Sequence, residues 1–424
     1  MYTEATYRAA RDKRDALLAI VGLGTTQIIG WGSTFTALTI FGTPIGETLG
    51  MRREVVFGGI TVMLLVSALL APRIGRFIDR LGARNVMVTG SLVAALAMLA
   101  QGTAQGVATY MFGWMLFGIA MPMMLNNAAM PGLVQVVGPN ARRAITGLTL
   151  ISGLTGTVFL PFSAWLLDHI GWRNAYLLFA VLHIAVCAPI HWLVLRRRNS
   201  PDGPMEGALS NSNGRSRTKP AAPAEGLLPP AMRRQAFILL TIWSCTEGLL
   251  TWGLYMQVID VFKGMGLSRD TAVWVWALVG PTQATARFAE LMSPGKHSIL
   301  TTAMGSSLMT TVSFGAFLLA GVSVPSAIVF CLLMGLGHGL FAVARNTLPL
   351  TLFGAREFGG YMGLLMVPQN IVNALAPVLF AFIITHIGPG SALWVAGLAA
   401  CLGCFAVLSL VRFCKQSMPA AQAA

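Results

Sequence analysis

Charged side chains are scarce in this chain. Asp, Glu, Lys and Arg together make up 10% of the 424 residues, whereas apolar residues make up 55%. A typical soluble domain carries about 25% charged residues, which it needs to cover its surface. The shortage excludes a soluble globular protein, and we expect the chain to lie in a lipid bilayer.

Acidic residues are the scarcer of the two charged classes, with 15 against 29 basic residues and a net charge of +14. In a soluble protein such an excess would indicate a nucleic-acid partner. With the N-terminus in the cytoplasm, however, 24 of the 29 basic residues fall on the cytoplasmic side of the expected spans. The positive-inside rule explains this asymmetry. The charge therefore indicates membrane orientation, with both termini in the cytoplasm, and we expect no nucleic-acid partner.

The chain also lacks the short motifs of common enzymes. It has neither the GxxxxGK[ST] of nucleotide-driven pumps nor the HExxH of zinc hydrolases. Its six cysteines are scattered, and Cys401 and Cys404 have no second pair or nearby histidine with which to hold a metal. We therefore expect no catalytic activity, no metal site and no cofactor.

Long apolar runs are abundant. Twelve segments have the length of about 20 residues that a helix needs to cross the hydrocarbon core. They must be helices, because backbone groups in lipid have to be satisfied within the segment. The expected spans are residues 16–40, 54–73, 85–104, 107–129, 144–167, 174–195, 235–259, 269–291, 298–320, 324–344, 361–385 and 391–412.

A polar stretch divides these spans into six and six. Residues 196–234 are rich in Pro, Ser, Asn and Gly and poor in apolar residues, which predicts a flexible cytoplasmic linker. It would join an N-terminal six-helix bundle, residues 1–195, to a C-terminal six-helix bundle, residues 235–424.

The two halves repeat one another weakly. Gln27 matches Glu247 at an offset of 220, and the tripeptide His-Ile-Gly occurs at residues 169–171 and again at 386–388, an offset of 217. Internal repeats of this kind are typical of transporter folds.

A motif follows the second span. The sequence GRFIDRLGAR fits the pattern G-x-x-x-D-R-x-G-x-R with Gly75, Asp79, Arg80, Gly82 and Arg84. Together with twelve spans, a six-plus-six repeat and a central linker, it resembles the major facilitator superfamily over nearly the whole chain. The resemblance implies an all-α membrane protein with twelve transmembrane helices in two six-helix bundles. We also expect a bacterial inner-membrane protein and a monomer, although the sequence does not specify the oligomeric state.

The residues of this motif have individual physical roles. Gly75 and Gly82 permit close helix approach and a tight turn, and Asp79 can accept backbone N–H groups at a helix N-terminus. The resemblance implies that Asp79 latches onto the segment 361–385 and steadies an outward-facing state, while Arg80 and Arg84 hold cytoplasmic groups or lipid phosphates. The alternative is that the basic residues only set membrane orientation.

Polar residues inside the spans are candidates for chemistry, because they are costly in hydrocarbon. Gln27 and Glu247 lie deepest, and Trp31 and Tyr255 follow them on the same helices, where they could line a shared substrate cleft with Gln27. Burial penalises the charged form of a carboxylate, so Glu247 is the candidate for proton coupling. The alternative for Glu247 is a structural hydrogen bond to a neighbouring helix.

The segment 269–291 contains a second candidate group. Gly280 and Pro281 predict a kink, and Gln283 and Arg287, four residues apart, share a helix face. Arginine can hold a carboxylate bidentately. The arrangement resembles the monocarboxylate transporter branch of the superfamily, in which an acidic residue precedes a substrate-binding arginine by four positions. Gln283 replaces that acidic residue here, and the alternative for Arg287 is a gate or orientation role at the inner edge.

Asn370 is a further candidate substrate contact, with an interhelical hydrogen bond as its alternative. We therefore expect a proton-coupled secondary transporter that moves a small organic anion, such as a monocarboxylate, by alternating access. Its partners would be this small-molecule substrate, protons and the bilayer. An efflux protein for a drug, metabolite or metalloid is the alternative, although Trp114 stands where proton-coupled exporters carry an arginine. A transport-dead membrane sensor is the remaining alternative.

Overall fold

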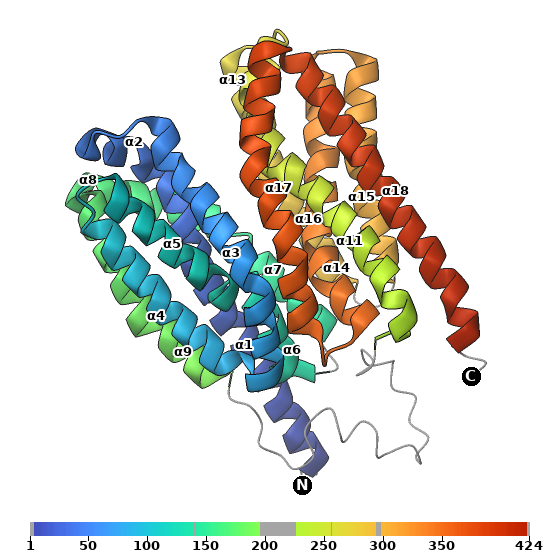
Figure 1. Cartoon of the computed structure of the whole chain (residues 1–424). Coiled ribbons are helices and arrows are strands. Elements are labelled where there is room, and N and C mark those ends of the chain that lie inside the picture. Colours follow the sequence, from blue (N-terminus) through green and yellow to red (C-terminus); the bar gives the residue numbers. More distant parts are fainter. Residues whose placement is uncertain (1–3, 139–140, 196–225, 256, 294–297, 422–424) are drawn as a thin grey trace. The chain divides into compact units, whose positions relative to one another are not determined.

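The computed structural model describes residues 4–138, 141–195, 226–255, 257–293 and 298–421, and within these ranges it contains helices and no strands (Figure 1). The chain divides into two compact units. The first contains the described parts of residues 1–225 together with 354–367, and the second contains 226–353 and 368–424.

The first unit is built on long helices in which α4 packs along α5 and α8, and α3 packs along α5. Its elements are α1 (Glu4–Trp31), the π-helix η1 (Gly32–Thr36), α2 (Ala37–Leu49), α3 (Arg53–Leu81), α4 (Ala83–Gly102), α5 (Val107–Met124), α6 (Asn126–Val137), α7 (Ala141–Ser152), α8 (Thr155–Leu182), the π-helix η3 (His183–Cys187) and α9 (Ala188–Val194).

In the second unit α15 packs along α16 and α18, and α14 packs along α16. Its elements are α11 (Pro230–Leu249), the π-helix η4 (Leu250–Leu254), α12 (Val258–Gly264), α13 (Arg269–Ala277), α14 (Val279–Met292), α15 (Ile299–Ala320), α16 (Val324–Phe353), α17 (Phe358–His386) and α18 (Pro389–Ala421). The start of α17, up to Val367, groups with the first unit.

Ten helical runs in the described ranges are long and apolar enough to cross a membrane. One of them, Ala141–Val194, contains a break at Gly171 (φ 74°, ψ 164°) and therefore holds two spans. The predicted span 269–291 corresponds to α13 and α14, which are interrupted at Leu278 and are individually short. In its described residues every predicted span is thus helical apart from short breaks, and the expected twelve-helix, all-α membrane fold is confirmed.

The boundary between the second and third spans differs from the predicted one. α3 does not end near residue 73 but continues to Leu81, because buried Ile74 and Ile78 extend its apolar stripe. Only Gly82 leaves the helix, with φ 84° and ψ 153°, and α4 begins at the next residue. Most of the GRFIDRLGAR motif is therefore helical. The Gln135 side chain joins the two helix ends by accepting from Ala83 N (3.0 Å) and donating to Ile78 O (3.2 Å).

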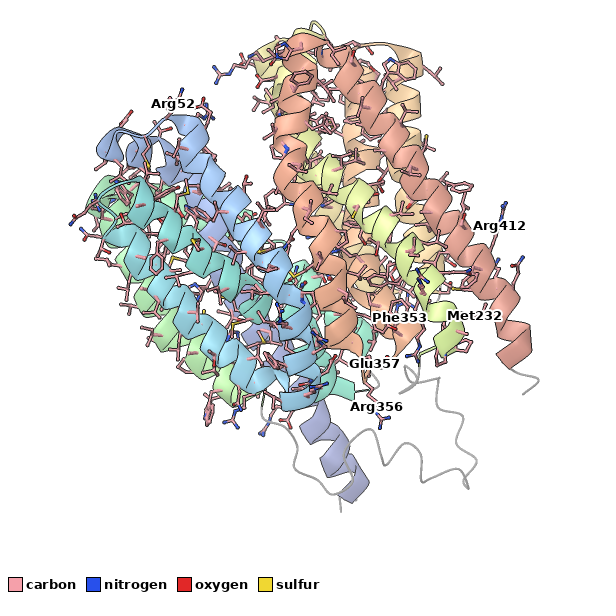
Figure 2. The ribbon with its side chains drawn as sticks, in the orientation of Figure 1. Arg52, Met232, Phe353, Arg356, Glu357 and Arg412 are labelled. Atoms are coloured by element: carbon pink, nitrogen blue, oxygen red, sulfur yellow. The ribbon has the colours of Figure 1, made fainter. Side chains whose placement is uncertain are left out.

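The predicted linker is only partly within the described residues, since 196–225 lie outside them. In the remaining part, α11 begins at Pro230, five residues before the predicted start of the seventh span at residue 235. The backbone N–H groups of Leu227 and Leu228 donate to carbonyl oxygens of residues 351 and 352 at the end of α16 (3.0 and 3.2 Å). Phe237 of α11 packs on Phe353 at the end of α16, with 6.3 Å between the ring centroids; Phe353 is labelled in Figure 2.

Candidate functional site

Ionisable and aromatic side chains from three parts of the second unit meet inside its membrane-spanning helices. Glu247 comes from α11, Tyr255 follows η4, Gln283 and Arg287 lie on α14, and His338 lies on α16. We call these five residues the polar cluster. Tyr255 interacts electrostatically with Glu247 and Arg287, and Arg287 interacts with His338. The structure therefore brings together four predicted site residues from segments far apart in the sequence.

The π-helix η4 positions the first two members of the polar cluster. It starts three residues after Glu247 and ends directly before Tyr255. A π-helical turn carries one residue more than an α-helical turn and is often found at functional sites. Thr251 stabilises this turn, because its hydroxyl donates to the Glu247 carbonyl oxygen (2.8 Å). The first unit has a π-helix, η1, at the corresponding place in the repeat.

A helix break positions the next two members. Pro281 has no N–H group and so cannot donate to the carbonyl oxygen of Ala277, four residues earlier. α13 ends at Ala277 and α14 begins at Val279, so the helical hydrogen bonding is interrupted at Leu278, as the sequence predicts for this proline; a bend of the helix axis stays a prediction. The Thr282 hydroxyl donates to the Leu278 carbonyl oxygen at the break. Beyond it, Gln283 and Arg287 lie one turn apart on α14.

Arg287 is half-buried and has a neutral partner. Its Nη2 donates to Gln283 Oε1 at 3.2 Å, and its Nε is enclosed without a hydrogen-bond partner. Glu247 is 4% exposed, and its carboxylate faces Thr310 of α15. Among the described residues no salt bridge is formed by Arg287 or by Glu247. The guanidinium therefore keeps its positive charge uncompensated within a membrane span.

Aromatic rings form an apolar wall beside these charges. The Tyr255 ring lies edge-on to Trp276 of α13, with 4.9 Å between the ring centroids, and 5.3 Å from the ring of His338. His338 in turn lies 5.7 Å from Phe341. A ligand with one charged and one apolar end matches this combination of a guanidinium and rings.

Polar residues of α17 in the second unit have structural partners. Gln369 Oε1 accepts from Arg345. The Asn373 side-chain amide has one orientation in which both its oxygen and its nitrogen are hydrogen-bonded. In that orientation the oxygen accepts from Trp252 Nε1 (3.2 Å) and the nitrogen donates to the Gln369 carbonyl oxygen (3.1 Å). Asn370 is buried, its Nδ2 is enclosed without a partner, and no hydrogen bond in the described residues joins it to the polar cluster. The substrate role of Asn370 stays a prediction.

Gln27 and Trp31 belong to the first unit and are described within it. α5 ends at Met124 and α6 begins at Asn126, so the carbonyl oxygen of Met124 is freed at the break. Gln27 is fully buried, and its Nε2 donates to this oxygen at 2.8 Å. The bond replaces the lost helical one, because a backbone carbonyl in lipid must be hydrogen-bonded within the protein. Trp31 packs on Phe35 with 4.9 Å between ring centroids. A substrate contact by either residue stays a prediction.

The motif aspartate binds the first turn of α17. Asp79 Oδ1 accepts from Gly359 N (2.8 Å) and Oδ2 accepts from Gly360 N (2.6 Å), at the helix end where N–H groups are free. Gly75 lets the two backbones approach, because a Cβ there would lie 2.2 Å from the Gly359 carbonyl oxygen. Arg356 and Glu357 lie in the short connection before this turn (Figure 2).

The motif arginines differ from one another in their surroundings. Arg80 is exposed. Its contacts with cytoplasmic groups or lipid phosphates stay a prediction. The Arg84 guanidinium stacks on the ring of Trp192 in α9, 3.4 Å from its centroid, in a cation–π contact that the sequence does not reveal.

His338 is the member of the polar cluster to which sequence reasoning assigned no specific role. The sequence does contain a signal that could have found it. His338 is an ionisable residue inside a predicted span, and Gly337 and Gly339 flank it directly. A Cβ at Gly337 would meet Thr310 Oγ1 at 2.6 Å, and one at Gly339 would meet the Gln283 carbonyl oxygen at 2.6 Å. The glycines therefore bring α16 against α15 and α14, and so bring the imidazole to the polar cluster.

Two curated relatives are similar to this chain over part of its length. It is 22% identical over 318 residues to monocarboxylate transporter 4 of Mus musculus, a match that covers 71% of this chain and 63% of that protein. It is 29% identical over 245 residues to the gallate transporter of Pseudomonas putida, covering 51% of each. The matches therefore span less than two thirds of the length of these relatives.

Solved structures with this fold cover nearly the whole chain. The human organic anion transporter MFSD10 (TETRAN) matches with a TM-score of 0.71 at 16% identity, over 93% of this chain and 99% of that one. The proton:xylose symporter XylE matches with a TM-score of 0.69 at 13% identity, over 96% of each. At these identities the likeness shows the fold. The family model of the Major Facilitator Superfamily matches residues 23–341, and the chain belongs to that superfamily.

Proposed function

We propose that the chain is a secondary transporter that moves a small organic anion of the monocarboxylate kind across the bacterial inner membrane, coupled to protons. Transport would follow alternating access, in which two helical bundles move around a midplane site. The polar cluster of the second unit would hold the substrate.

The observation that carries this proposal is that the Arg287 guanidinium, inside a membrane span, has no salt-bridge partner among the described residues. Arg287 is bound to a neutral amide, and Glu247, the carboxylate within the polar cluster, forms no salt bridge with it among the described residues. A cation within a membrane span is costly unless it is paired. A substrate carboxylate would supply the missing partner of Arg287 through bidentate hydrogen bonds.

The other members of the cluster have complementary roles in the proposal. Tyr255 Oη has no hydrogen-bond partner in the described residues and is not enclosed, so it is free to donate to the substrate. The rings of Tyr255 and Trp276 would contact the apolar part of the substrate. Glu247, buried near both Tyr255 and Thr310, would carry the proton. The names of the relatives, a monocarboxylate transporter and a gallate transporter, support a carboxylate as the cargo.

Uptake into proteoliposomes tests the proposal. Purified protein would be reconstituted, a pH gradient imposed, and the entry of labelled carboxylates followed. We expect gradient-dependent uptake by the wild type and less than about 1% of that rate for Arg287→Ala, because a charged hydrogen-bonded partner of the anion is lost.

Arg412→Ala is the matched control, since Arg412 is an exposed arginine of α18 (Figure 2). It should transport at the wild-type rate. Normal flux through Arg287→Ala, or the absence of gradient-dependent flux across a broad panel of carboxylates in the wild type, would refute the proposal.

A further inference from the structure

The Thr251 hydroxyl lies between the carbonyl oxygen of Glu247 and one ring nitrogen of His338. The Thr251 hydroxyl donates its single proton to the Glu247 carbonyl oxygen (2.8 Å), and its oxygen lies 3.5 Å from His338 Nδ1. With that proton engaged, the hydroxyl can only accept from the ring. This arrangement favours the tautomer of the imidazole that carries its hydrogen on Nδ1.

In that tautomer the second ring nitrogen, Nε2, is a hydrogen-bond acceptor. The guanidinium groups of Arg287 and Arg345 both act on the imidazole, and Coulomb repulsion opposes a third positive charge beside them. In the described residues Nε2 has no hydrogen-bond partner, and it is not among the enclosed polar atoms. Tyr255 and Phe341 pack against the ring, with centroids 5.3 and 5.7 Å from its own, and restrict its orientation.

We infer that His338 selects organic anions that carry a hydroxyl group. The carboxylate would bind Arg287, and the hydroxyl would donate to His338 Nε2. This inference rests on the proposed function, because it assumes a carboxylate at Arg287. An oxo group only accepts hydrogen bonds and would face the Nε2 lone pair, and an unsubstituted carbon offers no hydrogen bond. A hydroxycarboxylate is therefore preferred to its oxo or unsubstituted counterpart.

Calorimetric titration of the purified full-length protein tests this preference. Two matched pairs of acids serve as probes: L-lactate with pyruvate, in which the hydroxyl is close to the carboxylate, and 4-hydroxybenzoate with benzoate, in which it is distant. We expect the hydroxylated member of at least one pair to bind roughly 3- to 10-fold more tightly, as one net hydrogen bond predicts. In His338→Phe, which keeps a ring and loses the acceptor, both members should bind equally.

Thr251→Val provides a second variant that keeps the side-chain shape. Without an acceptor for Nδ1, the tautomer with hydrogen on Nε2 becomes accessible and can donate to an oxo group. Pyruvate should then gain affinity relative to L-lactate by about threefold or more. Thr285→Val is the matched control, because Thr285 lies exposed on α14 and its hydroxyl donates to the Pro281 carbonyl oxygen; its preference should equal that of the wild type.

The outcomes separate this inference from the proposed function. Binding of all four acids without preference within either pair, or an unchanged preference in His338→Phe or Thr251→Val, overturns the role of His338 and leaves the anion site standing. If none of the acids binds to the wild type, the anion site itself is refuted, and the role of His338 with it.

Discussion

At the scale of single residues, the roles that we propose for the polar cluster separate recognition of the anion's charge from proton transfer. Arg287 has a neutral partner and an uncompensated charge, whereas Glu247 is buried near a phenol and a threonine hydroxyl. Sequence reasoning identified both residues, because ionisable groups inside apolar runs are easily seen. It gave His338 no specific role, since its importance depends on Thr251 and on the glycines that bring α16 to its neighbours.

The first prediction concerns Glu247. In Glu247→Gln the amide keeps the shape of the carboxyl group but cannot release a proton. We expect proton-driven accumulation of the substrate to fall at least tenfold in proteoliposomes, while exchange of internal for external substrate is partly retained.

Glu47→Gln is its control, because Glu47 is an exposed glutamate of α2; it should accumulate substrate normally. A Glu247→Gln protein that accumulates substrate as the wild type does, and loses only exchange, would remove Glu247 from proton coupling.

At the scale of helices, the contact between α3 and the first turn of α17 combines a charge with close packing. Asp79 accepts two backbone N–H groups, and Gly75 leaves the space in which Gly359 lies. The sequence predicted the acceptor role of Asp79 and the close approach at Gly75. It did not predict that α3 continues to Leu81, because charged residues in the motif conceal a stripe of buried Ile74 and Ile78. We propose that this contact is the gate implied by the motif.

Asp79→Asn should loosen the start of α17. The neutral amide has one acceptor oxygen, and its NH₂ group would face an N–H donor, so about 1.5–3 kcal/mol of charged hydrogen bonding is lost. Hydrogen–deuterium exchange of the Gly359 and Gly360 amides should become at least about tenfold faster. Asp168→Asn, at an exposed aspartate of α8, should leave this exchange unchanged. Equal protection in the two variants would contradict the capping role of Asp79.

Gly75→Ala tests the close packing separately from the charge. The new Cβ would lie 2.2 Å from a backbone oxygen, so the helices must separate, at a cost of about 1–3 kcal/mol. We expect a lower Tm for the detergent-solubilised protein. Gly58→Ala lies on the same helix with nothing within 4 Å of its Cβ, and should leave Tm unchanged or slightly raised. A Tm for Gly75→Ala equal to that of Gly58→Ala would show that the contact is not close in solution.

At the scale of the whole molecule, twelve membrane spans and the distribution of basic residues predict the orientation of the chain. Alkaline phosphatase, which is active only outside the cytoplasm, would be fused after individual connections. We expect activity after Gly50 and Gly171, and none after Gly138 or at the C-terminus, because basic residues collect on the cytoplasmic side. Activity at the C-terminus would reverse the proposed orientation.

The sequence by itself determined that the protein lies in a lipid bilayer, where its membrane spans are and which superfamily it resembles. These follow from local properties, since about 20 apolar residues can only be satisfied as a helix in lipid, and a motif is read along the chain. Only the tertiary structure decided which polar residues share a site. It brought Arg287 within electrostatic range of His338 and gave Gln27 a backbone partner at the break after Met124. Helix rotation, π-turns and glycine contacts set these neighbours, and they depend on packing between segments that the sequence pattern does not specify.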